Sequence, residues 1–320
     1  MRMMLVKIGI VVSMALLVFS ACYRSERGLP SNASQSSAPS ASPITAQASD
    51  LELTKQLATL GKAIDGNVAV TVVHVESGRT VEIEGAKKLP LYSVFKLPLA
   101  VEVLKRVEEK SISPEQKLRV TPEDVAPGSQ FNADLWRQPA EKNVTELLKY
   151  SIVRSDNTSS DKLLELVGGP AVVTQRMRTL GFQNIDIVST VREYSAKRDK
   201  PNLGTSADLA RLLAQLQKGE VLQQPTLSLL VGFMERARTG GERRLRANLP
   251  AGTQVAEKTG SGSDATNDVG LITLPDGRGH LAMAVLINGS KSTSEKQEKL
   301  IAELARAAYD SFVSSVSAVQ

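Results

Sequence analysis

Histidine and cysteine are almost absent from this chain of 320 residues, which contains only His74, His280 and Cys22. A single cysteine excludes an internal disulfide and any cysteine-based metal cluster. Two histidines so far apart in the sequence argue against a zinc site, and we expect neither a metal nor any other cofactor. A Ser-His-Asp triad would have to use one of these two histidines, and no motif supports either of them. If the chain forms a covalent ester, lysine and carboxylate groups must therefore transfer the protons.

Aromatic residues are also scarce, at 4% of the chain, and the net charge of +5 is spread along the sequence. Proteins that bind single-stranded nucleic acid combine a basic surface with stacking aromatic side chains. We therefore expect no nucleic-acid partner. The hydrophobic fraction of 42% and the charged fraction of 23% are ordinary for a globular protein with a sizeable core.

The first 22 residues have the pattern of a secretory signal. Arg2 and Lys7 precede an apolar run over residues 8–19, which is shorter than the about 20 apolar residues that a bilayer requires. Small residues stand directly before Cys22, and this arrangement is similar to a bacterial lipobox. The resemblance implies cleavage before Cys22 and lipid attachment to it, whereas a plain signal peptide is the alternative. We expect secretion across the inner membrane to the periplasm or cell surface, with a lipid anchor.

Residues 23–48 are rich in Ser, Ala, Pro and Gln and poor in large apolar residues. Such a segment buries too little surface to order itself, so it is predicted to be a flexible tether. The folded part is expected to begin at Ser49, which is a suitable N-cap for an amphipathic helix from Asp50 to about Ile64.

The order of elements in the folded part predicts its fold class. Strand patterns occur near both ends of the folded part, at residues 67–75, 80–84, 254–258, 268–274 and 280–288, and a helix over 294–316 closes the chain. Between them, apolar residues at spacings of three and four predict helices over 97–107, 144–152, 161–167, 206–216 and 226–238. We predict an α/β (α+β) fold: residues 49–92 plus 242–320 form an antiparallel sheet flanked by the N- and C-terminal helices, and residues 93–241 form an inserted all-helical subdomain.

The first motif with chemical meaning is Ser93-Val94-Phe95-Lys96. The apolar stretch that follows places Ser93 at a helix N-terminus, where free backbone N–H groups stabilise an oxyanion. Lys96 lies on the same helical face, within reach of the hydroxyl. Ser93 is therefore a candidate nucleophile with Lys96 as a base. The motif is weak alone, and a second match at Ser159-Ser160-Asp161-Lys162 is interpreted as accidental.

The second motif, Ser155-Asp156-Asn157, lies in a loop between two predicted helices. Ser155 is a candidate for passing a proton to a leaving nitrogen, and the Asn157 amide can bind a substrate carbonyl. Asp156 is expected to brace the loop through backbone hydrogen bonds, as Asx residues often do.

The third motif, Lys258-Thr259-Gly260-Ser261, lies on a predicted strand. Lys258 and the hydroxyls of Thr259 and Ser261 can receive a substrate carboxylate, while the Ser261 N–H is a candidate second oxyanion donor. Gly260 is expected to let the substrate backbone approach closely. An exposed edge strand protected by a lysine is the alternative interpretation.

The three motifs in this order and spacing resemble the class A serine β-lactamases and, more broadly, the penicillin-recognising serine enzymes. The likeness extends over residues 50–316 and includes Arg246-Ala247-Asn248-Leu249-Pro250 and the segment 268–277. It implies a β-lactamase/transpeptidase-like fold with the active site between an α/β domain and a helical domain. The implied substrate is a β-lactam antibiotic.

Class A enzymes hydrolyse their acyl-enzyme with a glutamate on a loop, usually within Arg-x-Glu. Here Glu193 is the only glutamate between Glu165 and Glu220, and it follows Arg192 directly. The resemblance implies that Glu193 activates the water, although Lys197 stands where the family has an asparagine. In acylation, either Lys96 or Glu193 acting through water is the base.

Many family members bind the substrate carboxylate with an arginine at the position of Val269 in this chain. Arg244 matches an alternative arginine position of other members, so the resemblance implies that Arg244 takes this role. The leading interpretation is a monomeric serine β-lactamase. A D-Ala-D-Ala carboxypeptidase-like enzyme, and a penicillin-binding sensor or trap that deacylates poorly, are the alternatives.

Overall fold

The computed structural model describes residues 43–317. At its centre is an antiparallel sheet of five strands in the order β2-β1-β9-β8-β7. The strands are β1 (Asn67–His74), β2 (Thr80–Ile83), β7 (Val255–Ser261), β8 (Ala265–Thr273) and β9 (His280–Asn288). The two ends of the folded part therefore build one sheet, because β1 pairs with β9 over its whole length.

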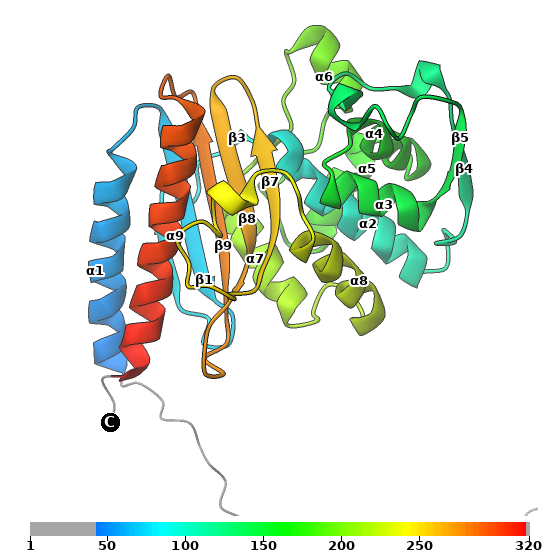
Figure 1. Cartoon of the computed structure of the whole chain (residues 1–320). Coiled ribbons are helices and arrows are strands. Elements are labelled where there is room, and N and C mark those ends of the chain that lie inside the picture. Colours follow the sequence, from blue (N-terminus) through cyan, green and yellow to red (C-terminus); the bar gives the residue numbers. More distant parts are fainter. Residues whose placement is uncertain (1–42, 318–320) are drawn as a thin grey trace, which may run out of the picture. The chain divides into compact units, whose positions relative to one another are not determined.

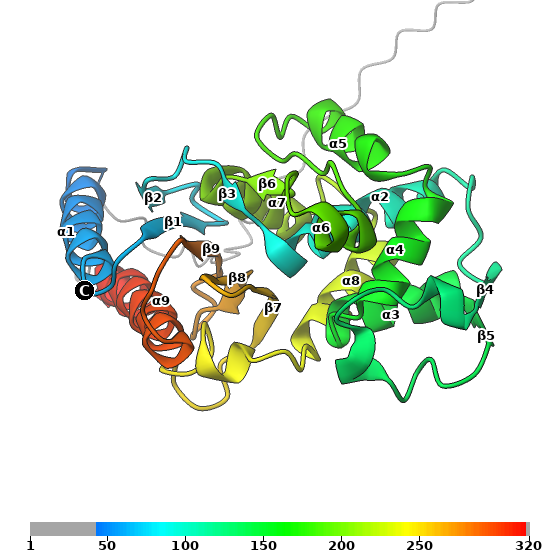
Figure 2. The same cartoon turned by 90° about the horizontal axis from the view of Figure 1, so that it is seen from above.

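Helices cover both faces of this sheet (Figures 1 and 2). Helices α1 (Pro43–Gly61) and α9 (Ser294–Ser317) pack against each other on one face, and α7 (Ser206–Gln217) packs on β1, β8 and β9 from the other. Alternating residues of the strands separate two apolar cores: Val70 and Val72 contribute to the core under α1 and α9, whereas Ala69 contributes to the core on the α7 side. The predicted sheet with flanking terminal helices is thus confirmed.

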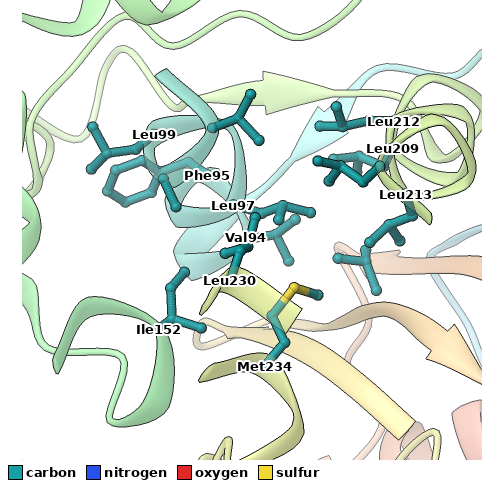
Figure 3. Close-up of a cluster of buried hydrophobic side chains, with 14 of the residues drawn as sticks. Val94, Phe95, Leu97, Leu99, Ile152, Leu209, Leu212, Leu213, Leu230 and Met234 are labelled. Atoms are coloured by element: carbon teal, nitrogen blue, oxygen red, sulfur yellow. The ribbon is translucent and has the colours of Figure 1, made fainter. Parts of the chain in front are cut away.

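The middle of the chain forms the helical half of the molecule. Its helices are α2 (Lys96–Glu108), α3 (Val144–Val153), α4 (Asn157–Leu166), α5 (Pro170–Thr179), α6 (Val191–Lys197) and α8 (Gln224–Glu235). Side chains of α2, α3, α7 and α8 gather in one cluster, part of which is shown in Figure 3. This cluster joins the helical half to the sheet. It fixes the N-terminus of α2 next to β7.

Short elements connect these parts. Two small antiparallel pairs of strands, β4 (Lys117–Val120) with β5 (Ala140–Asn143) and β3 (Leu89–Pro90) with β6 (Leu203–Gly204), lie outside the main sheet. Four 3-10 turns lie within residues 43–317: η1 (Tyr92–Phe95), η2 (Pro122–Asp124), η3 (Ser129–Asn132) and η4 (Gly241–Arg243).

The structure corrects the predicted start and end of the first helix. Helix α1 begins at Pro43, so the last residues of the predicted tether are helical, and it ends at Gly61 instead of Ile64. Ser49 lies inside this helix and is not its N-cap. The signal peptide, Cys22 and most of the tether lie outside the described residues. No helix between residues 43 and 317 is long and apolar enough to cross a membrane.

The described residues group into one unit. The division into an α/β subdomain (49–92 plus 242–320) and a helical subdomain (93–241) therefore stays a prediction.

Candidate active site

Ser93 lies in the turn η1, directly before helix α2, as the sequence predicts. Its neighbour Tyr92 adopts a left-handed backbone conformation with φ of 48°, which is uncommon for a bulky residue and is held only by surrounding contacts. One such contact is the buried side chain of Asn267, whose amide donates to the carbonyl of Pro90 at 2.9 Å and to that of Leu91 at 3.2 Å. The strand β8 therefore fixes the turn that presents the nucleophile.

The side chain of Lys96 connects the first two motifs. Its Nζ lies 3.2 Å from Ser93 Oγ, 3.2 Å from Ser155 Oγ and 2.7 Å from Asn157 Oδ1, and it donates to the Ser155 carbonyl at 2.6 Å. Lys96 is fully buried. In the described part of the chain, no other ionisable side chain is within hydrogen-bond distance of Ser93 Oγ. This position is compatible with a base, and the role of Lys96 stays a prediction at this point.

Ser155 is shared by two lysines. Its Oγ lies 3.2 Å from Lys96 Nζ and 3.0 Å from Lys258 Nζ, and its backbone is left-handed with φ of 52°. Because a hydroxyl has two acceptor lone pairs and one proton, bonds from both lysines leave the Ser155 proton free to be donated. All three motifs therefore meet at one hydroxyl group.

Burial shifts the protonation of both lysines. Desolvation lowers the pKa of Lys96 to about 7, against a smaller opposing effect from the carboxylates of Asp156 and Asp161. Desolvation and the nearby charge of Lys96 lower the pKa of Lys258 well below its usual value. At neutral pH a substantial part of Lys96 is therefore neutral, as a base requires.

Asp156 has the bracing role that the sequence predicts. Its carboxylate accepts bonds from Trp136 Nε1 at 3.1 Å and from the backbone N–H and hydroxyl of Ser159 at 2.7 and 2.6 Å. These bonds hold the loop that carries Ser155 and Asn157. The second Ser-x-x-Lys match, in which Ser159 lies, serves this brace and is not a nucleophile site.

Alternation along β7 separates the third motif into two sets. Thr259 and Ser261 line the cavity beside Ser93, whereas Lys258 points to Ser155. An added Cβ at Gly260 would lie 2.6 Å from the carbonyl oxygen of Leu91. Gly260 therefore lets β7 approach the turn before Ser93, and its close approach to substrate backbone stays a prediction. The edge strand β7 is also not exposed, because most of its residues are buried.

Arg244 lies behind Ser261, which lines the larger cavity at Ser93. It is 4% exposed, donates to the carbonyls of Gly260 and Asn267, and pairs with Glu298. Its remaining contact is a bond of 2.7 Å from a terminal nitrogen to Ser261 Oγ. Arg244 therefore lines neither cavity and is not positioned to bind a substrate carboxylate directly. The guanidinium instead orients the Ser261 hydroxyl, which does face the cavity.

Two cavities meet at Ser93. The larger, of about 1290 Å³, lies between α3, the segment after α8 and β7. The smaller, of about 310 Å³, lies between α6 and the end of β7. Asn157 and Ser261 border both cavities, as expected for residues at the reacting centre.

The arrangement agrees with comparisons to known proteins. The model of the β-lactamase enzyme family matches residues 52–312. The chain belongs to this family. The extended-spectrum β-lactamase PER-1 of Pseudomonas aeruginosa is 34% identical over 247 residues, which cover 73% of this chain and 78% of the relative. The β-lactamase VEB-1 of the same organism is 29% identical over 278 residues, or 82% and 90% of the two chains.

Solved structures of family members have the same fold. The TLA-1 extended-spectrum β-lactamase is similar with a TM-score of 0.79 and 31% identity, covering 83% of this chain and 99% of the other. A β-lactamase from Chitinophaga pinensis DSM 2588 has a TM-score of 0.77 and 30% identity over 81% and 98% of the two chains. The predicted class A β-lactamase fold is therefore confirmed.

Glu193 departs from the family pattern that the sequence suggested. Its carboxylate accepts the backbone N–H of Thr190 at 2.8 Å, and the Thr190 hydroxyl accepts the N–H of Glu193 at 3.1 Å, which is a capping box. The face of α6 toward the small cavity carries Val191, Tyr194, Ser195 and Arg198. These residues follow the helical spacing of three, four and seven, so Glu193 points elsewhere and is exposed. The structure does not bring Glu193 to Ser93.

Asp161 is a site residue that the sequence reasoning missed. Its carboxylate oxygens accept the backbone N–H groups of Val191 at 2.8 Å and Arg192 at 3.0 Å. Burial raises the pKa of Asp161, although these bonds and the charge of Lys96 oppose the rise. Asp161 thus ties α6 to α4 beside the base. The sequence signals it only by its place about one turn after Ser155-Asp156-Asn157, within the Ser-x-x-Lys match interpreted as accidental.

Proposed function

We propose that this member of the family is a serine β-lactamase that hydrolyses the β-lactam amide through an acyl-enzyme on Ser93. The observation that carries the proposal is the meeting of three motifs at the Ser155 hydroxyl, with Lys96 bridging it to Ser93. Relatives in both comparisons are named β-lactamases, and this favours hydrolysis of β-lactams over the carboxypeptidase and sensor alternatives.

Acylation begins with neutral Lys96. Its Nζ takes the proton from Ser93 Oγ, which attacks the lactam carbonyl, and the lone position of Lys96 beside this oxygen supports the assignment. As the C–N bond breaks, Ser155 gives its proton to the leaving nitrogen. Lys96 then returns a proton to Ser155 across 3.2 Å, so that the relay ends in its starting state.

The ring carboxylate of the substrate is assigned to the hydroxyls of Thr259 and Ser261. Both residues line the large cavity beside Ser93. Arg244 donates to Ser261 Oγ at 2.7 Å, which directs the Ser261 proton outward toward an acceptor. Lys258 lines neither cavity and is assigned to Ser155, to whose hydroxyl its Nζ donates at 3.0 Å.

Deacylation is assigned to Lys96 as well. Within residues 43–317, neither cavity at Ser93 is lined by an aspartate, glutamate or histidine, and Glu193 is held in its capping box. Neutral Lys96 takes a proton from water, the hydroxide attacks the ester carbonyl, and the proton passes to the departing Ser93 Oγ. Lys96 therefore replaces the glutamate that the family resemblance implied.

The test of the function follows nitrocefin or benzylpenicillin turnover together with intact protein mass. We expect multiple turnovers by the native protein, and no hydrolysis and no adduct for Ser93→Ala. A stable stoichiometric adduct on the native protein indicates a trap instead of a hydrolase. Cleavage of a D-Ala-D-Ala peptide with negligible β-lactam turnover indicates a carboxypeptidase.

We also propose that the protein is exported and anchored by lipid on Cys22, and that it is monomeric. Support comes from the N-terminal sequence alone: a charged start, an apolar run over residues 8–19 and small residues before Cys22. The mass of the mature N-terminal peptide tests this proposal. A lipid-modified Cys22 that is lost in Cys22→Ser is expected, whereas an unmodified N-terminus contradicts the anchor.

A further inference from the structure

The wall of the large cavity is rich in cations. Of the residues that line it, five are basic and none is acidic, within the described part of the chain: Lys149, Arg154, Arg236, Arg238 and Arg243. The small cavity has a single basic lining residue, Arg198. We call the large cavity the cationic cleft.

Two of these five cations are neutralised by neighbours. Arg154 forms two bonds of 2.7 and 2.6 Å with the carboxylate of Asp134. Arg243 pairs with Glu298 at 2.8 Å and with Glu242 at 2.7 Å. These two guanidinium groups therefore add little net field to the cleft.

The other three, Lys149, Arg236 and Arg238, have no carboxylate within ion-pair distance among residues 43–317. All three are exposed, and the Arg236 guanidinium rests over the Phe233 ring at 5.6 Å from its centroid. Like charges that line a concave wall raise the local concentration of anions, because the low-dielectric wall focuses their field. The cleft thus has an unmatched positive potential.

The cations adjoin the place assigned to the ring carboxylate. Arg236 and Arg238 shortly precede Thr239, whose hydroxyl lies 2.6 Å from that of Thr259. In a cephalosporin, the substituent at C3 is attached next to the carbon that bears the ring carboxylate. A carboxylate bound at Thr259 therefore directs the C3 substituent toward this group of cations.

We infer that the cationic cleft binds a second anionic group of the substrate, so that β-lactams with an anionic C3 substituent are preferred over matched neutral or cationic ones. This inference rests on the proposed function. The ring carboxylate is assigned to the hydroxyl groups of Thr259 and Ser261, so the three unpaired cations are available for the additional charge.

The test uses three cephalosporins with the same 7-acyl side chain. Ceftriaxone has an acidic heterocycle at C3, cefotaxime a neutral acetoxymethyl group and cefepime a quaternary ammonium group. Their inhibition constants against nitrocefin hydrolysis report affinity whether or not they are turned over. At low ionic strength we expect ceftriaxone to bind about tenfold more tightly than cefotaxime and cefepime to bind more weakly, with the differences shrinking in 0.5 M salt to about twofold.

Variants assign the effect to the cleft. Arg236→Gln/Arg238→Gln is expected to reduce the ceftriaxone preference to about twofold. The matched control is Lys117→Gln/Arg119→Gln, which removes two exposed charges of β4 that line neither cavity. This control is expected to keep the full preference.

Equal inhibition by all three compounds, or the same loss of preference in the control, overturns the inference while leaving the β-lactamase function intact. Failure to hydrolyse nitrocefin, with no adduct on Ser93, overturns the proposed function and the inference together. Circular dichroism of both double variants verifies that they are folded.

Discussion

The two cavities that meet at Ser93 have opposite characters. The cationic cleft is large and lined by unpaired arginine and lysine side chains, whereas the α6 cavity is about a quarter of its volume and lined by Tyr92, Val191 and Tyr194 among others. The wall between them holds Ser93, Asn157 and Ser261. The larger cavity therefore favours anionic groups, whereas the smaller has a single basic lining residue, Arg198.

We assign substrate recognition to the two cavities and the proton transfers to groups at the wall that the cavities share. Neither cavity supplies a carboxylate from the described residues, and we therefore assign the proton transfers to Lys96, which is fully buried. The cleft can therefore carry a strong positive potential without an acidic residue that would neutralise it.

The largest expected effect follows loss of the base that both cavities share. Lys96→Ala should reduce kcat/KM for nitrocefin by about 10²- to 10⁴-fold, because general base catalysis is of this size. Lys96→Arg is the matched variant that keeps the charge but cannot release its proton at neutral pH. A Lys96→Arg variant with native activity would contradict the role of Lys96 as base.

A smaller effect is expected on the α6 side from Asp161→Asn. The Asp161 carboxylate raises the pKa of Lys96 from its desolvated value, so its removal should lower that pKa further. Native kcat/KM should rise with pH as Lys96 loses its proton near pH 7, and in the variant this rise should move to lower pH. The pH profile measures it, with Glu165→Gln on the same helix as control.

The same variant should also loosen α6. The asparagine side chain retains a single acceptor oxygen for the N–H groups of Val191 and Arg192, and the loss of one hydrogen bond costs about 1 kcal/mol in the free energy of unfolding. Urea unfolding tests this value. An unchanged pH profile would show that Asp161 acts on α6 alone and not on the base.

The smallest effect is expected for Glu193→Gln. Glutamine also completes a capping box, so the variant should keep the N-terminus of α6 and turn over nitrocefin within about twofold of the native rate. Intact mass should show no accumulated adduct. An adduct that persists in Glu193→Gln but not in the native protein would restore Glu193 as the deacylating base.

Much of the fold could be predicted because periodicity reports burial directly. The strands near both ends and the helices α2, α3, α7 and α8 have their expected positions to within a few residues. The short helix α6 was not predicted, because its seven residues carry no apolar stripe and its start depends on the Thr190–Glu193 capping box. Helix α5 was missed as well: half of its residues are polar, and only Val173 and Met177 are buried.

The site was predictable in part. The three motifs identified Ser93, Lys96 and Ser155, and the structure brings them together. Arg244 was expected to contact the substrate directly, but packing places it behind Ser261. For Gly260, the structure shows a close approach to the turn before Ser93 that the sequence did not predict. The role of the unpaired cations Arg236 and Arg238 could not be predicted, because a sequence does not show which charged side chains form ion pairs in the folded protein.

The sequence by itself determined which serine and lysine are the candidates for nucleophile and base, and the order in which the chain builds the sheet, because these depend on local spacing and periodicity. Only the tertiary structure decided which side of α6 faces Ser93 and which arginines remain unpaired. Those outcomes depend on contacts between residues far apart in the chain, such as Asp161 with Val191 and Arg243 with Glu298. Burial, which lowers the pKa of Lys96 to about 7, is likewise a property of the assembled core.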